Sequence, residues 1–214
     1  MSPQTTPAAA WKGPTGDAYF HEHQGMTPER RSFWHRWEDR LTVRGYSVLE
    51  VGAGTGENLR VLSHASARVG VDLAPAALRV MASEKSATPA LADAAALPFG
   101  ATAFDWVITA GCLIHVPGEH LPAALREVGR VASRDVLLLE YDDTIWGNAA
   151  LVREIPWRGY RDVCWARPYA RLFAQHNPDF TLLEHRPLPS SDGWDRVVLA
   201  HLRRSAPSWV RHGR

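Results

Sequence analysis

Short apolar runs alternate with amphipathic stretches along most of the chain, and this alternation predicts β-strands that alternate with α-helices. The expected strands, in chain order, are residues 46–51, 68–72, 89–92, 104–110 and 135–140. The expected helices between them are residues 57–62, 75–83 and 121–131. Repeated units of a strand followed by a helix predict a parallel sheet with helices on both faces.

The two ends of this region follow a different pattern. A capping residue and a proline, Thr27 and Pro28, precede aromatic residues at helical spacing, which predicts a helix before the first strand. Near the other end, residues 180–185 and 195–202 are strand-like runs joined by a Pro/Ser/Gly turn that leaves no room for a crossover helix. The expected fold class is therefore α/β: a Rossmann-like, doubly wound, mostly parallel seven-stranded sheet that ends in an antiparallel hairpin.

Composition narrows the class of protein. The 214 residues suit one domain, and 45% hydrophobic with 22% charged residues is typical of a folded soluble chain. No apolar run is long enough to span a bilayer, and a formal net charge of +1 gives no field that would concentrate nucleic acid or an anionic membrane. Cys112 and Cys164 lack the spacing of a metal site or a disulfide framework. These features favour a cytoplasmic protein with neither nucleic acid nor a membrane as its partner, and a monomer or a homodimer is expected.

The organisation of the chain follows from the same pattern. Residues 1–10 have neither a basic region nor an apolar stretch, so a disordered leader is expected here rather than a signal peptide. Residues 11–214 are expected to form a single domain. Within it we expect a helical cap over about residues 11–44 and a substrate lid in the long link from about residue 142 to residue 168.

Three glycines at alternate positions, Gly52, Gly54 and Gly56, follow the first predicted strand. Glycine lets the backbone pass close to a ligand, and the N-terminus of the following helix offers free N–H groups. A dinucleotide-binding loop would have its third glycine one residue later, where this chain has Glu57, and a carboxylate is poorly placed beside a pyrophosphate. The spacing therefore favours a cofactor without phosphates.

Acidic residues lie at the ends of the first three predicted strands. Glu50 is placed to accept hydrogen bonds at the charged end of a cofactor, and Asp72 closes the second strand, where a carboxylate can bind both hydroxyls of a ribose. Asp93 follows the third strand and is placed to accept from an adenine amine. Phe99 would lie either against that ring or in the core. The alternative is that the glycines serve tight packing and the aspartates cap helices.

The order of these segments resembles the class I methyltransferase family across about residues 45–203. The resemblance implies the fold of that family, S-adenosylmethionine as the cofactor and S-adenosylhomocysteine as its product. It also implies a set of cofactor-binding residues, which are Tyr19, Glu50, Gly52, Ala53, Gly54, Gly56, Asn58, Asp72, Leu73, Asp93, Ala94, Ala110 and His115. No clustered spacing of histidines and aspartates requires a metal.

Several segments outside the glycine loop are similar to the pseudaminic acid biosynthesis-associated methylases, a bacterial group of small-molecule methyltransferases. They are residues 11–13, 16–19, 107–116, 139–141 and 154–162. The chain differs from that group at an Arg-Asn pair, here Glu22 and His23, and at a Gln-Asp-Asp stretch, here within residues 191–194. The resemblance therefore implies a small polar acceptor, such as a modified sugar, an amino acid or a secondary-metabolite intermediate, without fixing its identity.

The insert after the fifth strand is expected beyond the carboxyl ends of the strands, where open α/β sheets bind ligands. Its substrate-binding candidates are Tyr141, Asp142, Trp157, Arg158, Tyr160 and Arg161. Aromatic faces and guanidinium groups can enclose a substrate and bind a carboxylate or a phosphate. The alternative is that the aromatic residues of the insert, Trp146 and Trp165 included, only pack it onto the domain.

His115 follows the fourth predicted strand and is the first candidate for a catalytic base, because a histidine near its ordinary pKa can take a proton from a substrate. Tyr141 is the second candidate, and the alternative for His115 is a structural role in its loop. The sequence thus predicts an S-adenosylmethionine-dependent methyltransferase acting on N or O of a small polar metabolite. The alternatives are a non-catalytic S-adenosylmethionine-binding sensor or scaffold, and a nicotinamide oxidoreductase, which the loop spacing disfavours.

Overall fold

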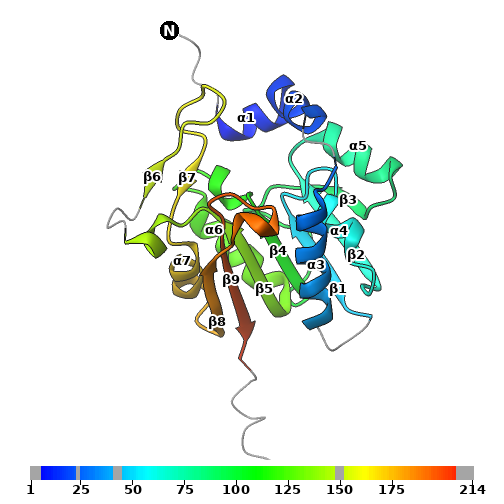
Figure 1. Cartoon of the computed structure of the whole chain (residues 1–214), viewed down its shortest axis with the longest axis vertical. Helices are drawn as coiled ribbons and strands as arrows, with labels where there is room; N and C mark the ends of the chain where they lie inside the picture. Colours follow the sequence, from blue (N-terminus) through cyan, green and yellow to red (C-terminus); the bar gives the residue numbers. More distant parts are fainter. Residues whose placement is uncertain (1–5, 23–24, 41–44, 148–151, 206–214) are drawn as a thin grey trace, which may run out of the picture.

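The computed structural model describes residues 6–22, 25–40, 45–147 and 152–205. At its centre is a seven-stranded sheet with the order β3-β2-β1-β4-β5-β9-β8 (Figure 1). The strands are β1 (Ser47–Val51), β2 (Ala67–Asp72), β3 (Thr88–Leu91), β4 (Phe104–Ala110), β5 (Ala132–Glu140), β8 (Phe180–Pro187) and β9 (Val198–Arg204). The first five strands in this order, β3-β2-β1-β4-β5, pair in parallel. Strand β9 is antiparallel to both β5 and β8. The predicted fold class, including the terminal hairpin, is confirmed.

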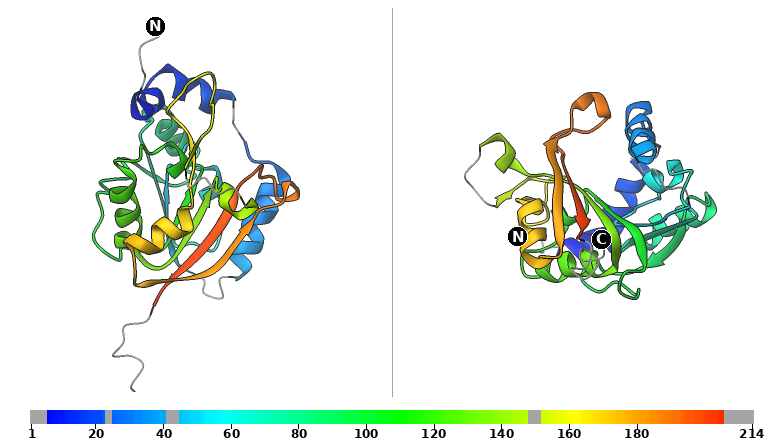
Figure 2. Two further views of the ribbon diagram at one scale, coloured as in Figure 1. Left: turned by 90° about the vertical axis from the view of Figure 1, so that its left-hand side faces the viewer. Right: turned by 90° about the horizontal axis from the view of Figure 1, so that it is seen from below.

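Helices cover both faces of the sheet, with α3, α4 and α5 on one face and α6 and α7 on the other (Figure 2). Their bounds are α3 (Pro28–Arg40), α4 (Glu57–Val61), α5 (Pro75–Ser83), α6 (Leu121–Val131) and α7 (Tyr169–His176). Successive side chains of a strand point to opposite faces, so each strand contributes to two cores. Val48 and Trp106 belong to the core under α3, whereas Leu49 and Val107 belong to the core under α6.

Aromatic residues anchor α3 to its face of the sheet. Phe33, Trp34 and Trp37 recur at helical spacing and are all buried, as the sequence predicted. Burial of each of these side chains stabilises the fold by about 1.5–3 kcal/mol, which fixes α3 beside β1. Among the described helices, none is both long and apolar enough to cross a membrane.

Three segments lie over the edge of the sheet where the parallel strands end (Figure 1). Helices α1 (Pro7–Lys12) and α2 (Pro14–Glu22) cross above this edge, and the insert after β5 rises beside them. The insert contains a small two-stranded sheet of β6 (Arg153–Glu154) and β7 (Trp165–Ala166). Short 3₁₀ helices complete the chain: η1 (Leu113–His115), η2 (Asp143–Trp146) and η3 (Ser190–Asp192).

Helix α1 lies where the sequence predicted a disordered leader, and that prediction is wrong for residues 7–10. The Thr6 side chain accepts a hydrogen bond from the backbone N–H of Ala9 at 3.2 Å, and a proline at the first helical position needs no donor there. Ala10 is buried, so tertiary packing holds a helix that its own length would not sustain. The remainder of the predicted leader, residues 1–5, lies outside the described residues.

Helix α7 and the start of β9 also differ from the prediction. No helix was predicted over Tyr169–His176, although Tyr169, Ala170 and Phe173 face the core at helical spacing. Strand β9 begins at Val198 rather than at residue 195, because the preceding residues belong to the connection that follows η3.

Candidate functional site

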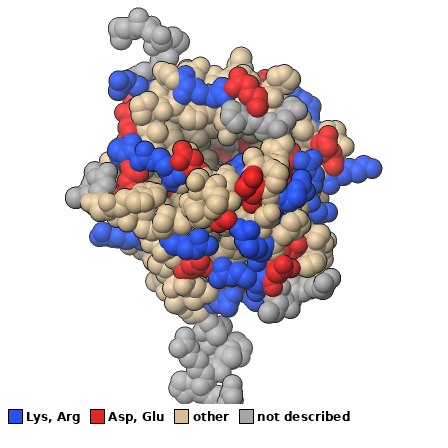
Figure 3. Space-filling model, viewed as in Figure 1, with Lys and Arg blue, Asp and Glu red and all other residues tan. Residues whose placement is uncertain are grey.

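A cavity of about 850 Å³ opens at the carboxyl ends of β1, β2 and β4, a volume within the range of small-molecule sites, which is about 300–1,000 Å³. Figure 3 shows the molecular surface hollowed below the N-terminal helices, with positive and negative side chains interspersed around it. The predicted site residues that line the cavity are Tyr19, Gly52, Asp72, Leu73, Asp93, Ala94, Ala110, His115 and Arg161. The structure thus brings together residues from segments that are far apart in the sequence.

The floor of the cavity is the glycine loop after β1. Gly52 has a φ of +74°, and a Cβ added there would lie 2.5 Å from the side chain of Cys112 on the loop after β4. A side chain at this position is therefore excluded both by the backbone conformation and by the neighbouring loop. Gly56 serves a different purpose, because it packs against Met81 and Ser86, away from the cavity.

Asp72, at the end of β2, faces the same loop. One carboxylate oxygen accepts from the backbone N–H of Gly54 at 2.8 Å, and the other accepts from the N–H of Ala74 at 2.9 Å. Each carboxylate oxygen has a second lone pair, and Asp72 lines the cavity, so both oxygens keep the capacity to accept from a ligand. Burial raises the pKa of Asp72, and the backbone donors oppose that shift.

Glu50 lies one strand away, buried beside the loop. Its Oε1 accepts from the side-chain amide of Asn58 at 2.6 Å, and the Asn58 carbonyl oxygen accepts from the Trp34 ring N–H at 2.8 Å. Its Oε2 is enclosed and has no hydrogen-bond partner among the described residues. Burial raises the pKa of Glu50 to about 8. Asn58 therefore positions Glu50, and Glu50 has one oxygen left for another group.

A cation without a counter-ion lies near this carboxylate. Arg30, on α3, acts on the pKa of Glu50, yet no carboxylate lies within 4 Å of its guanidinium among the described residues. Its Nε is enclosed without a partner, and its Cζ lies 3.8 Å from the centre of the Trp194 ring. Burial lowers the pKa of Arg30. No sequence motif marks Arg30, although its helical spacing to Phe33 and Trp34 places it toward the buried side of α3.

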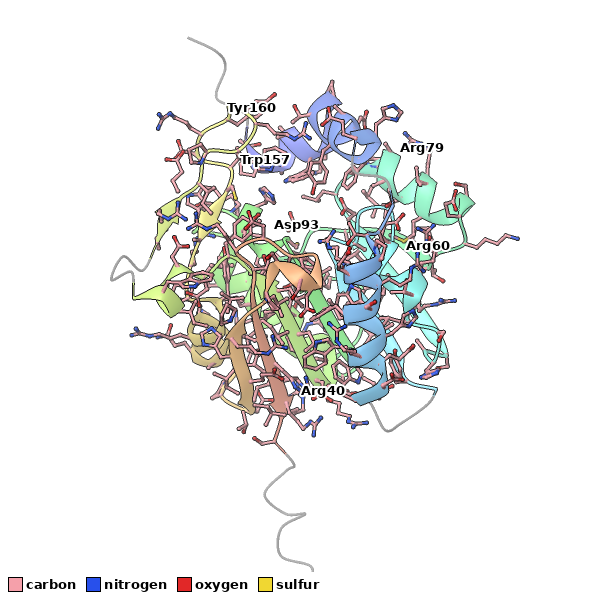
Figure 4. The ribbon with its side chains drawn as sticks, in the orientation of Figure 1. Arg40, Arg60, Arg79, Asp93, Trp157 and Tyr160 are labelled. Atoms are coloured by element: carbon pink, nitrogen blue, oxygen red, sulfur yellow. The ribbon has the colours of Figure 1, made fainter. Side chains whose placement is uncertain are left out.

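The other end of the cavity lies beyond β3. Asp93 lines it and accepts from the backbone N–H of Ala95 at 2.9 Å, and Figure 4 shows the Asp93 side chain at the open centre of the molecule. Ala94 and Ala110 offer small side chains on either side. Phe99 packs edge-to-face on Phe104 at 5.0 Å, so it belongs to the core and not to the cavity.

His115 is held in a fixed orientation at the end of η1. Its Nδ1 lies 2.6 Å from the backbone oxygen of Val163, and because a carbonyl only accepts, Nδ1 carries the proton and Nε2 has a free lone pair. Burial lowers the pKa of His115 to about 4, so the ring is neutral at pH 7. The carboxylate of Glu140, at the end of β5, accepts from the backbone N–H groups of Cys112, Leu113 and Ile114 and holds this loop.

Helices α1 and α2 are joined to the insert above the cavity. The Trp11 ring lies 4.8 Å from His115 and 5.0 Å from Trp157, and the Thr15 and Tyr160 hydroxyls are 2.8 Å apart. Figure 4 shows Trp157 and Tyr160 on the loop of the insert beside the N-terminal helices. Arg158 donates to Glu22 at 2.5 Å, and so it serves this junction.

Other predicted residues do not line the cavity. Tyr141 packs between the two cores, and Asp142 caps η2 by accepting from the backbone N–H of Thr144 at 3.0 Å. Ala53 is buried in the core beside α5, and Trp146 is 52% exposed. Trp165 of the insert does line the cavity, as does Trp11 of α1.

Comparison with known proteins relates the chain to methyltransferases. Residues 48–135 match a protein family described as a methyltransferase domain. Over 96 residues the chain is 35% identical to an uncharacterized protein of Methanocaldococcus jannaschii, an alignment that covers 44% of this chain and 36% of that protein. The chain therefore spans about a third of the length of this curated relative.

Two solved structures extend the likeness to nearly the whole chain. The 1,6-didemethyltoxoflavin-N1-methyltransferase of Burkholderia thailandensis is 15% identical with a TM-score of 0.68, and the match covers 89% of this chain and 86% of that one. The magnesium protoporphyrin IX methyltransferase of Synechocystis is 15% identical with a TM-score of 0.65, covering 92% and 97%. Both structures contain S-adenosylhomocysteine. The chain therefore has the fold of the class I methyltransferases, and its residues 48–135 match the methyltransferase domain.

Proposed function

We propose that the protein is an S-adenosylmethionine-dependent methyltransferase of a small polar metabolite. The observation that carries the proposal is a buried carboxyl group and a half-buried guanidinium beside the glycine loop, each with an atom that has no hydrogen-bond partner. Glu50 has an enclosed oxygen without a partner, and Arg30 has an enclosed nitrogen without a partner. An amino acid group, with an ammonium and a carboxylate, satisfies both atoms, and S-adenosylmethionine ends in such a group.

The rest of the proposed cofactor site follows the cavity. Asp72 would accept from the ribose hydroxyls with the free lone pairs of its two oxygens, and Asp93 would accept from the adenine amine. When bound, S-adenosylmethionine supplies an electrophilic methyl group on a sulfonium sulfur. The glycine loop would bring the backbone close to the cofactor, because Gly52 adopts a φ of +74° and has no Cβ to meet Cys112.

Methyl transfer depends chiefly on the proximity of the reacting groups and on the exclusion of water, so few catalytic residues are needed. Trp11 and Trp157 cover His115 and keep water from the reacting groups. For a hydroxyl acceptor, His115 Nε2 would accept the proton that the oxygen releases as it takes the methyl group. An ammonium acceptor would first give up its proton, which frees the nitrogen lone pair for the attack. Glu140 positions His115 through the backbone of the loop that precedes it.

The proposed acceptor is a modified sugar, an amino acid or a secondary-metabolite intermediate. The similarity of several segments to the pseudaminic acid biosynthesis-associated methylases supports this acceptor class. The names of the two structural relatives, a magnesium protoporphyrin IX methyltransferase and a 1,6-didemethyltoxoflavin-N1-methyltransferase, support a small-molecule acceptor in general. We further propose that residues 11–214 act as one domain, with residues of about 142–168 as its substrate lid; residues 148–151 lie outside the described part of the chain.

Turnover separates this proposal from the alternative of a non-catalytic sensor or scaffold. The purified protein, incubated with S-adenosylmethionine labelled in the methyl group and a cell metabolite extract, should release S-adenosylhomocysteine and a labelled small molecule. Binding of S-adenosylmethionine without any such release would favour the sensor.

Glu50→Gln should have opposite effects on stability and on cofactor binding. Burial raises the pKa of Glu50 from 4.5 to about 8, so the folded, cofactor-free protein holds a proton on Glu50 that the unfolded chain releases. The cofactor-free protein therefore loses stability as pH rises from 4.5 to about 8. Thermal unfolding should therefore show the variant above the wild type in melting temperature by a margin that grows with pH. Its affinity for S-adenosylhomocysteine should fall about tenfold, because the charged acceptor for the ammonium is gone.

A matched control is Glu84→Gln, a carboxylate whose side chain is 56% exposed. It should leave both the pH profile and the affinity as in the wild type. An unchanged affinity in Glu50→Gln would contradict the assignment of Glu50 to the ammonium.

A further inference from the structure

A buried arginine on the insert side of the cavity has two guanidinium nitrogens that make no hydrogen bond with the described residues. Arg167 follows β7, is 4% exposed and lines the cavity. Its Nη1 donates to the backbone oxygen of Val116 at 2.8 Å and lies 3.4 Å from the Tyr169 hydroxyl. Its Nε and Nη2 make no hydrogen bond with the described residues. Both atoms keep some accessible surface.

The free edge is the one that suits an oxyanion. The N–H groups of Nε and Nη2 point in parallel, and this fork matches two oxygens of a carboxylate or a phosphate. Among the described residues, no carboxylate lies within 4 Å of the Arg167 guanidinium. The Trp165 ring, with its centre 4.6 Å from Cζ, holds the guanidinium plane without neutralising its charge. A buried cation without a counter-ion is costly, so the charge is available to a ligand.

The position of Arg167 favours a contact with the methyl acceptor over a contact with the proposed cofactor. Val163 binds the His115 ring and Arg167 binds the backbone of Val116, so the same segment of the insert holds both the base and the arginine. Arg161, an exposed cation, lines the same side of the cavity. The groups proposed to bind the amino acid end of the cofactor lie elsewhere, on β1 and α3.

We propose that the methyl acceptor carries an oxyanion, either a carboxylate or a phosphate group, which Arg167 binds through Nε and Nη2 while the acceptor's nucleophilic atom faces His115. This inference rests on the proposed function and names the substrate class of the same site. It assigns to Arg167 the part that the sequence suggested for Arg158, whose guanidinium is paired with Glu22.

The test uses two simple oxyanions as probes on the protein saturated with S-adenosylhomocysteine. Sodium phosphate and sodium malonate, each against sodium chloride of equal ionic strength, are titrated while the melting temperature is followed. At least one probe should raise the melting temperature of the wild type. The apparent affinity for that probe should fall about tenfold or more in Arg167→Met and in Arg167→Lys, which keeps a donor for Val116 but loses the fork. Arg126→Gln, on the exposed side of α6, is the matched control and should respond as the wild type does.

The outcomes separate this inference from the proposed function. A response to phosphate alone supports a phosphorylated acceptor, and a response to malonate alone supports a carboxylate. A wild type that binds S-adenosylhomocysteine yet responds to neither probe overturns the inference and leaves the methyltransferase intact. Full retention of the response in Arg167→Met also overturns it. Failure to bind S-adenosylhomocysteine at all contradicts the proposed function instead.

Discussion

Asp72→Ala is expected to weaken the binding of S-adenosylhomocysteine by about 1–3 kcal/mol, which is roughly a 5- to 150-fold loss of affinity. The reason is the loss of the charged hydrogen bonds that the ribose hydroxyls would donate to Asp72, whose side chain lines the cavity. Isothermal titration calorimetry on the two proteins measures the change directly. An unchanged affinity would show that Asp72 does not bind the ribose.

Asp72 also holds the backbone at Gly54 and Ala74, so a loss of affinity in Asp72→Ala has to be separated from a loss of structure. Asp72→Asn keeps the shape and one carbonyl acceptor but loses the charge, and it should retain the fold while binding more weakly than the wild type. Asp39→Ala removes an exposed carboxylate of α3 and serves as the control for net charge. Melting temperatures of the three variants report on the fold.

His115→Ala is expected to lower turnover about 10²- to 10⁴-fold if the acceptor is deprotonated during transfer, with the affinity for S-adenosylhomocysteine preserved. The pKa of His115 is lowered to about 4, so the wild-type ring stays neutral as pH falls from 7 to about 5, where an ordinary histidine would be protonated. Wild-type turnover should therefore not decline with a midpoint near pH 6.5. Equal activity of wild type and His115→Ala in the release of S-adenosylhomocysteine would leave His115 a structural role only.

The elements with a regular hydrophobic pattern were predictable from the sequence. β1, β4 and β5 are buried runs between helices with an apolar face, which predicts a mostly parallel sheet. The short link between the last two strands excludes a crossover helix, which predicts the antiparallel hairpin. The glycine loop and Asp72 were predictable for a related reason, since the carboxyl ends of parallel strands meet at one edge. Helix α1 was not, because its stability depends on contacts of Ala10 and Trp11 with distant parts of the chain.

The acceptor side of the cavity was less predictable. Tyr141 and Asp142 follow β5 at the same edge as Asp72, yet their side chains serve the core and the cap of η2. Arg158 and Arg167 are both arginines of the insert, and only the structure separates the one paired with Glu22 from the one with a free edge. In an irregular segment, the direction of a side chain depends on tertiary contacts, and no periodic sequence pattern predicts it.

One measurement tests the central claim most directly, namely calorimetric titration of the purified protein with S-adenosylhomocysteine and, separately, with reduced nicotinamide adenine dinucleotide. The account predicts that S-adenosylhomocysteine binds with one molecule per chain and that the nicotinamide dinucleotide does not compete with it. Tight binding of the dinucleotide, with no heat from S-adenosylhomocysteine, would contradict it.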